Sequence, residues 1–187
     1  SKLTLIAVEP DTEKVAALRA KYDATGLLGT RVVIHQGNPL TFELPAYMAE
    51  LIVAEDLRAL GGSLNADTWK TVYKSLRPYG GTACLNLGET AYTQLATTVE
   101  EKHLPRAELK QAEGFTLLTR VGALPGSANW THEYGDASNT LMSRDELVKA
   151  PLGVLWFGGP AGHGDLFYNR HDWGPSMAVI EGRMFLQ

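Results

Sequence analysis

Short apolar runs alternate with segments of helical periodicity along the first two thirds of this chain. The runs lie at residues 3–8, 31–36, 49–56 and 82–87. Asp11 or Thr12 is placed to cap a helix that should stop near Gly26, and Asn65 is placed to cap a second helix before the fourth run. This order of strands and helices predicts an α/β fold with a mainly parallel sheet covered by helices.

The sheet is expected to end with antiparallel strands. A further helix is predicted over residues 90–102, and two short strands are predicted within residues 107–122. Glu113 and Gly114 separate these strands, and an acidic residue followed by glycine between two strand patterns indicates a hairpin. The last two strands of the sheet should therefore pair with each other.

Composition and charge narrow the classes of function. The 187 residues are 44% hydrophobic, which is enough for one sizeable core or two small ones. The net charge of −4 gives no reason to expect a nucleic-acid partner. No apolar run approaches the roughly 18 residues that span a bilayer, and the N-terminus lacks the regions of a secretory signal. The single cysteine, Cys84, lies in an apolar run and is interpreted as a buried structural thiol.

The first strand ends in an acid that points to nucleotide chemistry. In the sequence LTLIAVEPD, Glu9 closes the strand directly before a helix. In nucleotide-binding α/β sheets an acid at this corner accepts hydrogen bonds from ribose hydroxyls, about 20 residues after a glycine-rich turn. No such turn precedes Glu9, and no GxGxxG or GxxxxGK[ST] pattern occurs elsewhere. The acid thus indicates one part of a binding site.

The order of elements resembles the class I S-adenosylmethionine-dependent methyltransferases from their second strand to their final hairpin. The matching features are the acid of VEPD, the GNPL turn, the AED strand end and the LRPYGG turn before TACLNL. The resemblance covers a first domain, residues 1–122, and implies an incomplete Rossmann-like methyltransferase sheet without its glycine-loop strand. That strand is central in the family, and each orphaned buried backbone group costs about 1–3 kcal/mol. We therefore expect another segment or another chain to supply it.

The resemblance also implies a nucleoside ligand and roles for particular residues. Glu9 would bind both ribose hydroxyls of S-adenosylmethionine, and Pro10 would set the direction of the chain. Asn38 would meet the adenine amino group within the turn that contains Pro39, and Leu40 would pack on the ring. The residues also fit plainer interpretations: Glu9 as an acid near a helix end, and Asn38 with Pro39 as a common turn pair.

The third strand ends in two more acids, Glu55 and Asp56. Ligands in open α/β sheets bind at the carboxyl ends of the strands, so Glu55 is predicted to face the substrate site. A solvated loop acid is the alternative. No general base and no other catalytic residue is indicated by the sequence.

The second domain, residues 123–187, changes character. It is rich in Gly, Pro and Trp, with short apolar runs between turn residues, and MAVIEGRMFLQ is expected to contribute one strand. Its segments ANWTHEYGDASNT and LVKAPLGVLWFGG resemble the start of a pyrroloquinoline-quinone-binding-like β-propeller of bacteria, fused to a methyltransferase-like domain. A propeller needs typically 4–8 blades, so this β-rich segment is a fragment of one, and the quinone would bind only in a longer protein. The polar cluster at residues 163–172 (His163, Asp165, His171 and Asp172) matches no metal motif and is interpreted as a loop.

Three functions remain open. The first is methyl transfer from S-adenosylmethionine, although without the glycine turn we do not expect this chain alone to be active. The second is a non-catalytic interaction or scaffold module of an exported, quinoprotein-like propeller protein. The third is quinone-dependent dehydrogenation, which would depend on residues beyond Gln187. The propeller resemblance implies a periplasmic or cell-envelope location, with the cytoplasm as the alternative. The methyl acceptor and the oligomeric state are not indicated.

Overall fold

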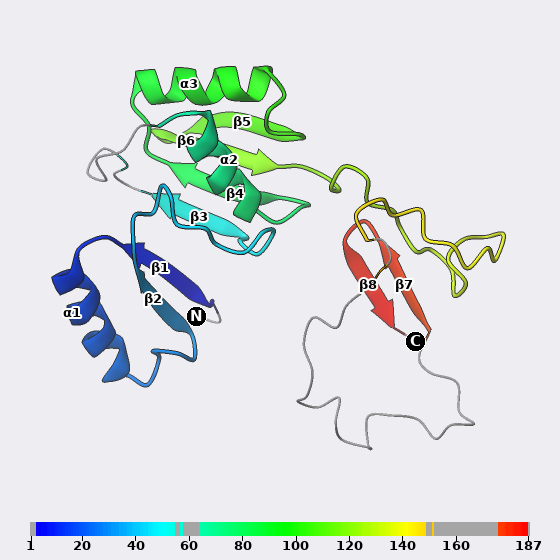
Figure 1. Ribbon diagram of the computed structural model, residues 1–187, viewed down its shortest axis with the longest axis horizontal. Helices are drawn as coiled ribbons and strands as arrows, with labels where there is room; N and C mark the ends of the chain where they lie inside the picture. The colour runs from blue at the N-terminus through cyan, green and yellow to red at the C-terminus, as the bar shows by residue number, and fades with distance from the viewer. Residues whose placement is uncertain (1–2, 55–56, 58–63, 149–150, 152–175, 187) are drawn as a thin grey trace. The chain divides into compact units, whose positions relative to one another are not determined.

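The computed structural model describes residues 3–54, 57, 64–148, 151 and 176–186 (Figure 1). The chain divides into two compact units, Ser1–Val121 and Gly122–Gln187. No helix among the described residues is long and apolar enough to span a bilayer.

The first unit begins with a β–α–β element made of β1 (Leu5–Glu9), α1 (Thr12–Asp23) and β2 (Val32–Gln36). The two strands are parallel, and Leu5 lies opposite Val32. Asp11 caps α1, because its carboxylate accepts hydrogen bonds from the backbone N–H groups of Glu13 and Lys14. The helix packs on β2 through a small core formed by Val15, Val32 and Ile34, with Ala7, Leu18 and Tyr22 around them. The first strand was predicted over residues 3–8, whereas β1 begins at Leu5 and includes Glu9.

The rest of the first unit is a four-stranded sheet with two helices. Its elements are β3 (Leu51–Ala54), α2 (Ala66–Ser75), β4 (Gly81–Leu85), α3 (Glu89–Glu100), β5 (Ala107–Ala112) and β6 (Phe115–Arg120). The strand order is β3-β4-β6-β5, with β3 parallel to β4 and the other pairs antiparallel. Glu113 and Gly114 both have positive φ angles, 53° and 83°, as a tight two-residue hairpin requires. The predicted antiparallel end of the sheet is confirmed.

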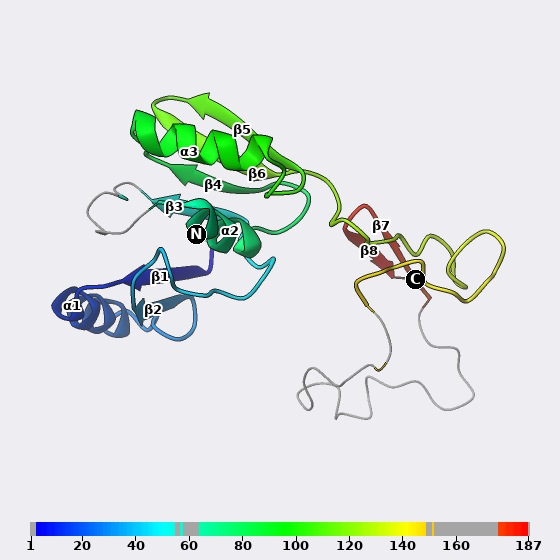
Figure 2. The ribbon, with the colours of Figure 1, turned by 45° about the horizontal axis from the view of Figure 1, so that its top comes forward.

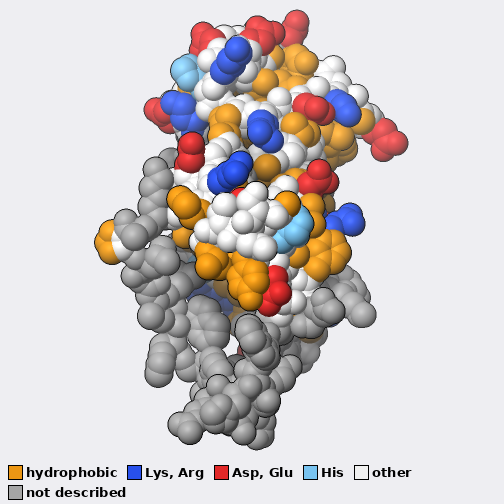
Figure 3. Space-filling view, turned by 90° about the vertical axis from the view of Figure 1, so that its right-hand side faces the viewer, with side chains coloured by type: hydrophobic (Ala, Val, Ile, Leu, Met, Phe, Trp, Pro, Cys, Tyr) orange, Lys and Arg blue, Asp and Glu red, His pale blue; other side chains and the backbone are white. Residues whose placement is uncertain are grey.

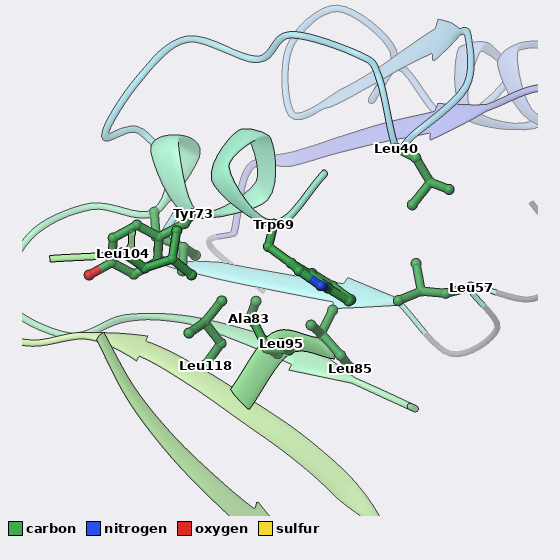
Figure 4. Packing of buried hydrophobic residues seen from close by; sticks show 10 residues of the cluster. Leu40, Leu57, Trp69, Tyr73, Ala83, Leu85, Leu95, Leu104 and Leu118 are labelled. Carbon is green, nitrogen blue, oxygen red and sulfur yellow. The ribbon is translucent and has the colours of Figure 1, made fainter. Parts of the chain in front are cut away.

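The main core lies between this sheet and its helices. Its largest fully buried side chains are Trp69, Leu76, Leu85, Leu95 and Leu118. Figure 4 shows Trp69 extending from α2 toward Leu85 and Leu95, and Leu40 lying opposite Leu57. Leu40 follows β2, so its burial in this cluster joins the β1–β2 element to the four-stranded sheet.

A buried arginine fastens α2 to the sheet. Arg120, the last residue of β6, donates a hydrogen bond from Nη2 to the carbonyl oxygen of Tyr73 at 2.6 Å. Its guanidinium carbon lies 3.8 Å from the centre of the Tyr73 ring and 5.4 Å from that of Tyr47. Burial lowers the pKa of Arg120, while the two tyrosines act in the opposite direction. The cation therefore stacks on an aromatic ring and also binds the last turn of the helix.

The second unit contains one described hairpin, β7 (Met177–Ile180) with β8 (Arg183–Leu186). Glu181 and Gly182 form its turn with φ angles of 48° and 74°. The prediction of a single strand over MAVIEGRMFLQ was therefore wrong, because this pair reverses the chain. Trp130 pairs with Val179 through two backbone hydrogen bonds, of 2.9 and 2.7 Å, so an earlier segment lies beside the hairpin.

Among the described residues, β1 and β3 are each paired on one side only. β1 pairs with β2, and β3 pairs with β4, but no described strand joins the two sheets. In Figures 1 and 2, β1 lies nearer to β3 than β2 does, and both arrows point the same way. The described part of the first unit is therefore an α/β fold with two separate sheets, β1–β2 and β3–β4–β6–β5.

Leucine-to-alanine substitutions should destabilise the protein strongly on the packed face of the sheet and only slightly on its exposed face. Leu85 is 1% exposed in the main core, whereas Leu51 is 61% exposed on the neighbouring β3. Leu85→Ala should lower the free energy of unfolding by about 2–5 kcal/mol, because it leaves a cavity. Leu51→Ala should change it by no more than about 0.5 kcal/mol. Urea titration of both variants measures this, and equal losses would contradict the described packing.

Candidate functional site

The candidate site is the edge of the first unit where the parallel strands end. β1 and β2 run in the same direction and in register, so Glu9 and Gln36 close them side by side. Asn38 follows two residues after β2, and Asn86 directly follows β4. Open α/β sheets bind ligands at the carboxyl ends of their strands, so these residues define the edge to examine.

Glu9 is a half-buried carboxylate fixed at the end of β1. One carboxylate oxygen, Oε1, accepts a hydrogen bond from the backbone N–H of Asp11 at 3.0 Å. The backbone oxygen of Glu9 also accepts from Gly37 N–H at 3.1 Å, so both the strand and the side chain are held. An ionised carboxylate accepts about four hydrogen bonds, so further acceptor sites remain for a ligand. The helix-end contact and the ribose role predicted for Glu9 are compatible with each other.

Pro10 and Asp11 connect β1 to α1. Pro10 is exposed and turns the chain between the two elements. The hydrogen bonds that Asp11 accepts, that from Lys14 N–H first, hold the pKa of its carboxyl below its ordinary value. The carboxyl of Asp11 therefore stays ionised to a lower pH than that of an ordinary aspartate, and its negative charge complements the positive end of the helix.

Asn38, Pro39 and Leu40 form the turn after β2. Oδ1 of Asn38 accepts a hydrogen bond from Leu40 N–H at 2.9 Å, which closes an Asx turn. This contact agrees with the plainer interpretation of Asn38 as a turn residue, and the role toward adenine stays a prediction. Leu40 is only 4% exposed within the main core. Its side chain therefore offers little surface to an adenine ring, and its main contact is with the protein itself.

The remaining predicted positions fall outside the described residues. Glu55 and Asp56 follow β3 there, and so do His163, Asp165, His171 and Asp172. Within the part of the chain that the structure describes, no three His, Cys, Asp or Glu side chains are grouped to hold a metal ion.

A hollow of about 230 Å³ lies at the carboxyl end of β4. It was not predicted from the sequence. Its lining comes from the turn into α3 and from two leucines before α2: Asn86, Leu87, Gly88, Glu89, Thr90, Ala91, Leu57 and Leu64. Gly88 is the N-cap of α3 and makes no side-chain capping bond. The hollow is smaller than the about 300–1,000 Å³ of common ligand pockets, so it suits only part of a large ligand. Its sequence signal was the polar Asn86 at the end of an apolar strand.

The surface charge shows no concentration of one sign on the face drawn in Figure 3. Lys and Arg side chains are interspersed there with Asp, Glu and hydrophobic side chains. The ion pairs among the described residues are single contacts, such as that of Arg77 with Glu50 at 3.0 Å. Exposed pairs of this kind contribute about 0–1 kcal/mol each.

Known protein structures resemble this chain in fold. No protein-family model and no curated protein matches the chain. The chain is similar to the crystal structure of a Methanococcus maripaludis protein provisionally described as an S-adenosyl-L-methionine-dependent methyltransferase. That likeness has a TM-score of 0.50 at 12% identity, over 65% of this chain and 68% of that one. The match shows that the chain has a methyltransferase-like α/β fold.

Two further solved structures are more distant. A Corynebacterium glutamicum protein matches at 16% identity with a TM-score of 0.47, over 65% of this chain and 62% of that one. A Bacillus halodurans protein provisionally described as a methyltransferase matches at 14% identity with a TM-score of 0.40, over 58% of this chain and 55% of that one. This chain thus spans less than two thirds of the length of either protein.

The capping carboxylate should give α1 a pH dependence of known sign. Because the folded pKa of Asp11 is lowered, its contribution to stability is present above the unfolded pKa and is lost as pH falls through the folded pKa. Asp11→Asn keeps the cap but removes the charge, so it should lose less stability than the parent between pH 7 and about pH 3. Urea midpoints at both pH values measure this.

The matched control is Asp23→Asn, which removes the same charge at the other end of α1. Asp23 caps no helix start, so this variant should retain the acid sensitivity that Asp11 confers. An identical acid response in the parent and Asp11→Asn would contradict the assignment.

Proposed function

We propose that this chain is the nucleoside-binding part of an S-adenosylmethionine-dependent methyltransferase-like domain. The observation that carries the proposal is Glu9, a held and half-buried carboxylate at the carboxyl end of β1. Vicinal ribose hydroxyls donate two hydrogen bonds, and an ionised acceptor makes the stronger kind. Asn38, after the neighbouring strand, would meet the adenine ring edge.

The described residues fit the nucleoside end of this cofactor better than its methionine end. Glu9 has acceptor capacity beyond its bond to Asp11 N–H. For the methionine end, no glycine-rich turn follows a strand among the described residues of the first unit. We therefore propose nucleoside binding by this chain, and methyl transfer only where the sheet is complete.

When bound, S-adenosylmethionine supplies an electrophilic methyl group. The contribution of this chain would be to orient the donor through Glu9 and to place the hollow beside Asn86 and Gly88 at the same edge. Holding donor and acceptor in line accounts for much of the catalysis of such a transfer. Glu55 is proposed to face the acceptor from the end of β3.

A second candidate is a non-catalytic interaction module. The two separate sheets favour it, because a site without its central strand lacks the groups that would hold the methionine end. The propeller resemblance of residues 123–187, pyrroloquinoline quinone in a longer protein and an exported location belong to this candidate and stay predictions. The described hairpin β7–β8 is compatible with a β-rich segment of any architecture.

Removal of the Glu9 carboxylate tests the proposal. Glu9→Ala should weaken binding of S-adenosylhomocysteine by about 1.5–3 kcal/mol in calorimetry, because the ribose hydroxyls lose a charged acceptor. Glu13→Ala, which removes an exposed carboxylate four residues away, should leave the affinity unchanged. Equal affinity of the parent and Glu9→Ala would reject the ribose assignment. Absence of binding to this chain and to a form with a completed sheet would reject the nucleoside function itself.

A further inference from the structure

β5 is the edge strand of the four-stranded sheet, at the end away from β3 (Figure 2). It pairs with β6 from Ala107, opposite Arg120, to Ala112, opposite Phe115. Among the described residues, no strand pairs with the other edge of β5. An edge of this kind is a template for another strand, and charged side chains on edge strands control which strand can pair there.

The backbone groups on this edge follow from the hydrogen bonds to β6. Arg106, which directly precedes β5, accepts a hydrogen bond from Val121 N–H at 3.0 Å, so its carbonyl group faces β6. Alternation along the strand then directs the backbone groups of Ala107, Leu109 and Gln111 to the outer edge. The Ala107 N–H already donates within the preceding turn. The outer edge therefore offers the N–H groups of Leu109 and Gln111 and the C=O groups of all three residues.

Two side chains of opposite charge lie between these outward-facing residues. Ala107 and Leu109 pack against the main core, so Glu108 and Lys110 project from the opposite face of the sheet. The side chains of Glu108 and Lys110 are 53% and 76% exposed, and Lys110 Nζ lies 3.9 Å from Glu108 Oε2. An exposed pair at this distance contributes little to stability, so both charges can also interact with a neighbouring strand.

The order of these residues makes the edge complementary to itself. In an antiparallel pair with a two-fold axis at Leu109, the outward backbone groups of both strands face each other, and Gln111 N–H reaches the C=O group of the partner's Ala107. Glu108 then lies opposite the partner's Lys110, and Lys110 lies opposite the partner's Glu108. Moving the axis by one residue sets Glu108 against its own copy, or Lys110 against its own copy. Like charges directly opposite each other are destabilising, so the charges favour the axis at Leu109.

We propose that β5 pairs antiparallel with β5 of a second copy of this chain, around a two-fold axis at Leu109. The two four-stranded sheets then form one continuous sheet. The partner is a second copy because both the charges and the outward backbone groups of this edge complement themselves. Two six-residue strands that meet edge to edge bury less area than a standard interface, so the dimer is weak. The inference concerns this edge and does not depend on nucleoside binding.

Charge reversal tests the register, with sedimentation equilibrium as the measurement. The parent chain should dimerise at concentrations below about 1 mM. Glu108→Lys and Lys110→Glu each create two like-charged pairs across the axis, so each should raise the Kd of the dimer about tenfold or more. The double variant Glu108→Lys/Lys110→Glu restores opposite charges and should dimerise like the parent. An equimolar mixture of the two single variants should form a heterodimer, because each chain then supplies charges of one sign.

Proline at Gln111 tests the backbone pairing. Gln111→Pro removes an N–H group that faces the outer edge, so the monomer should stay folded in circular dichroism while the dimer loses two hydrogen bonds. The matched control Gln111→Ala keeps the N–H group and should dimerise like the parent. Three results would overturn the proposal: a parent that stays monomeric at about 1 mM, a mixture of the folded single variants that stays monomeric, or a dimer whose Kd the single charge reversals leave unchanged. The last result is expected if the dimer forms through β7 and β8 instead.

Discussion

The backbone hydrogen-bonding requirement of β1 and β3 is the constraint on which the rest of the first unit depends. Each strand satisfies one side through a parallel partner, and alternate N–H and C=O groups face the gap between them. The two helices follow from the same strands, because right-handed crossovers in opposite directions cover opposite faces. Beside the unpaired edge of β3, Leu51 and Val53 are exposed, although Ile52 between them and Ala54 after them pack on the core. On β3, the unpaired edge and the exposed side chains thus occur together.

Local elements could be predicted from the sequence because their causes are local. Asp11 and Asn65 cap α1 and α2 through their own side chains, as residues at those positions do in many helices. Glu113 and Gly114 form the predicted hairpin, and both occupy the left-handed region. The hairpin at Glu181 and Gly182 has the same chemistry and was missed, because the surrounding apolar run was interpreted as continuous. Interpreting both acidic–glycine pairs alike would have found it.

The contacts that join elements could not be predicted in this way. Leu40 was expected to contact a ligand, yet the fold buries it among core residues far along the chain. Arg120 binds the Tyr73 carbonyl oxygen across 47 positions, and nothing in its neighbouring residues indicates that partner. The hollow beside Asn86 likewise requires the relative placement of β4, α3 and Leu57. For Glu9 the sequence indicated the correct corner of the fold, since strand end and helix start are local, and its ligand stays a proposal.

The unpaired edge of β1 also bears on how a ligand would bind. Glu9 lies at the carboxyl end of β1, and among the described residues no strand pairs with the other edge of β1. A parallel strand paired with that edge would end next to Glu9. If the end of that strand contacts the same ligand, strand docking and ligand binding become coupled equilibria, and each must strengthen the other by the same factor. A low ligand affinity of this chain alone would then reflect the absence of that strand and would say little about the contribution of Glu9. Under the proposed function, Glu9 and a strand paired with the open edge of β1 would then both contribute to one ligand site.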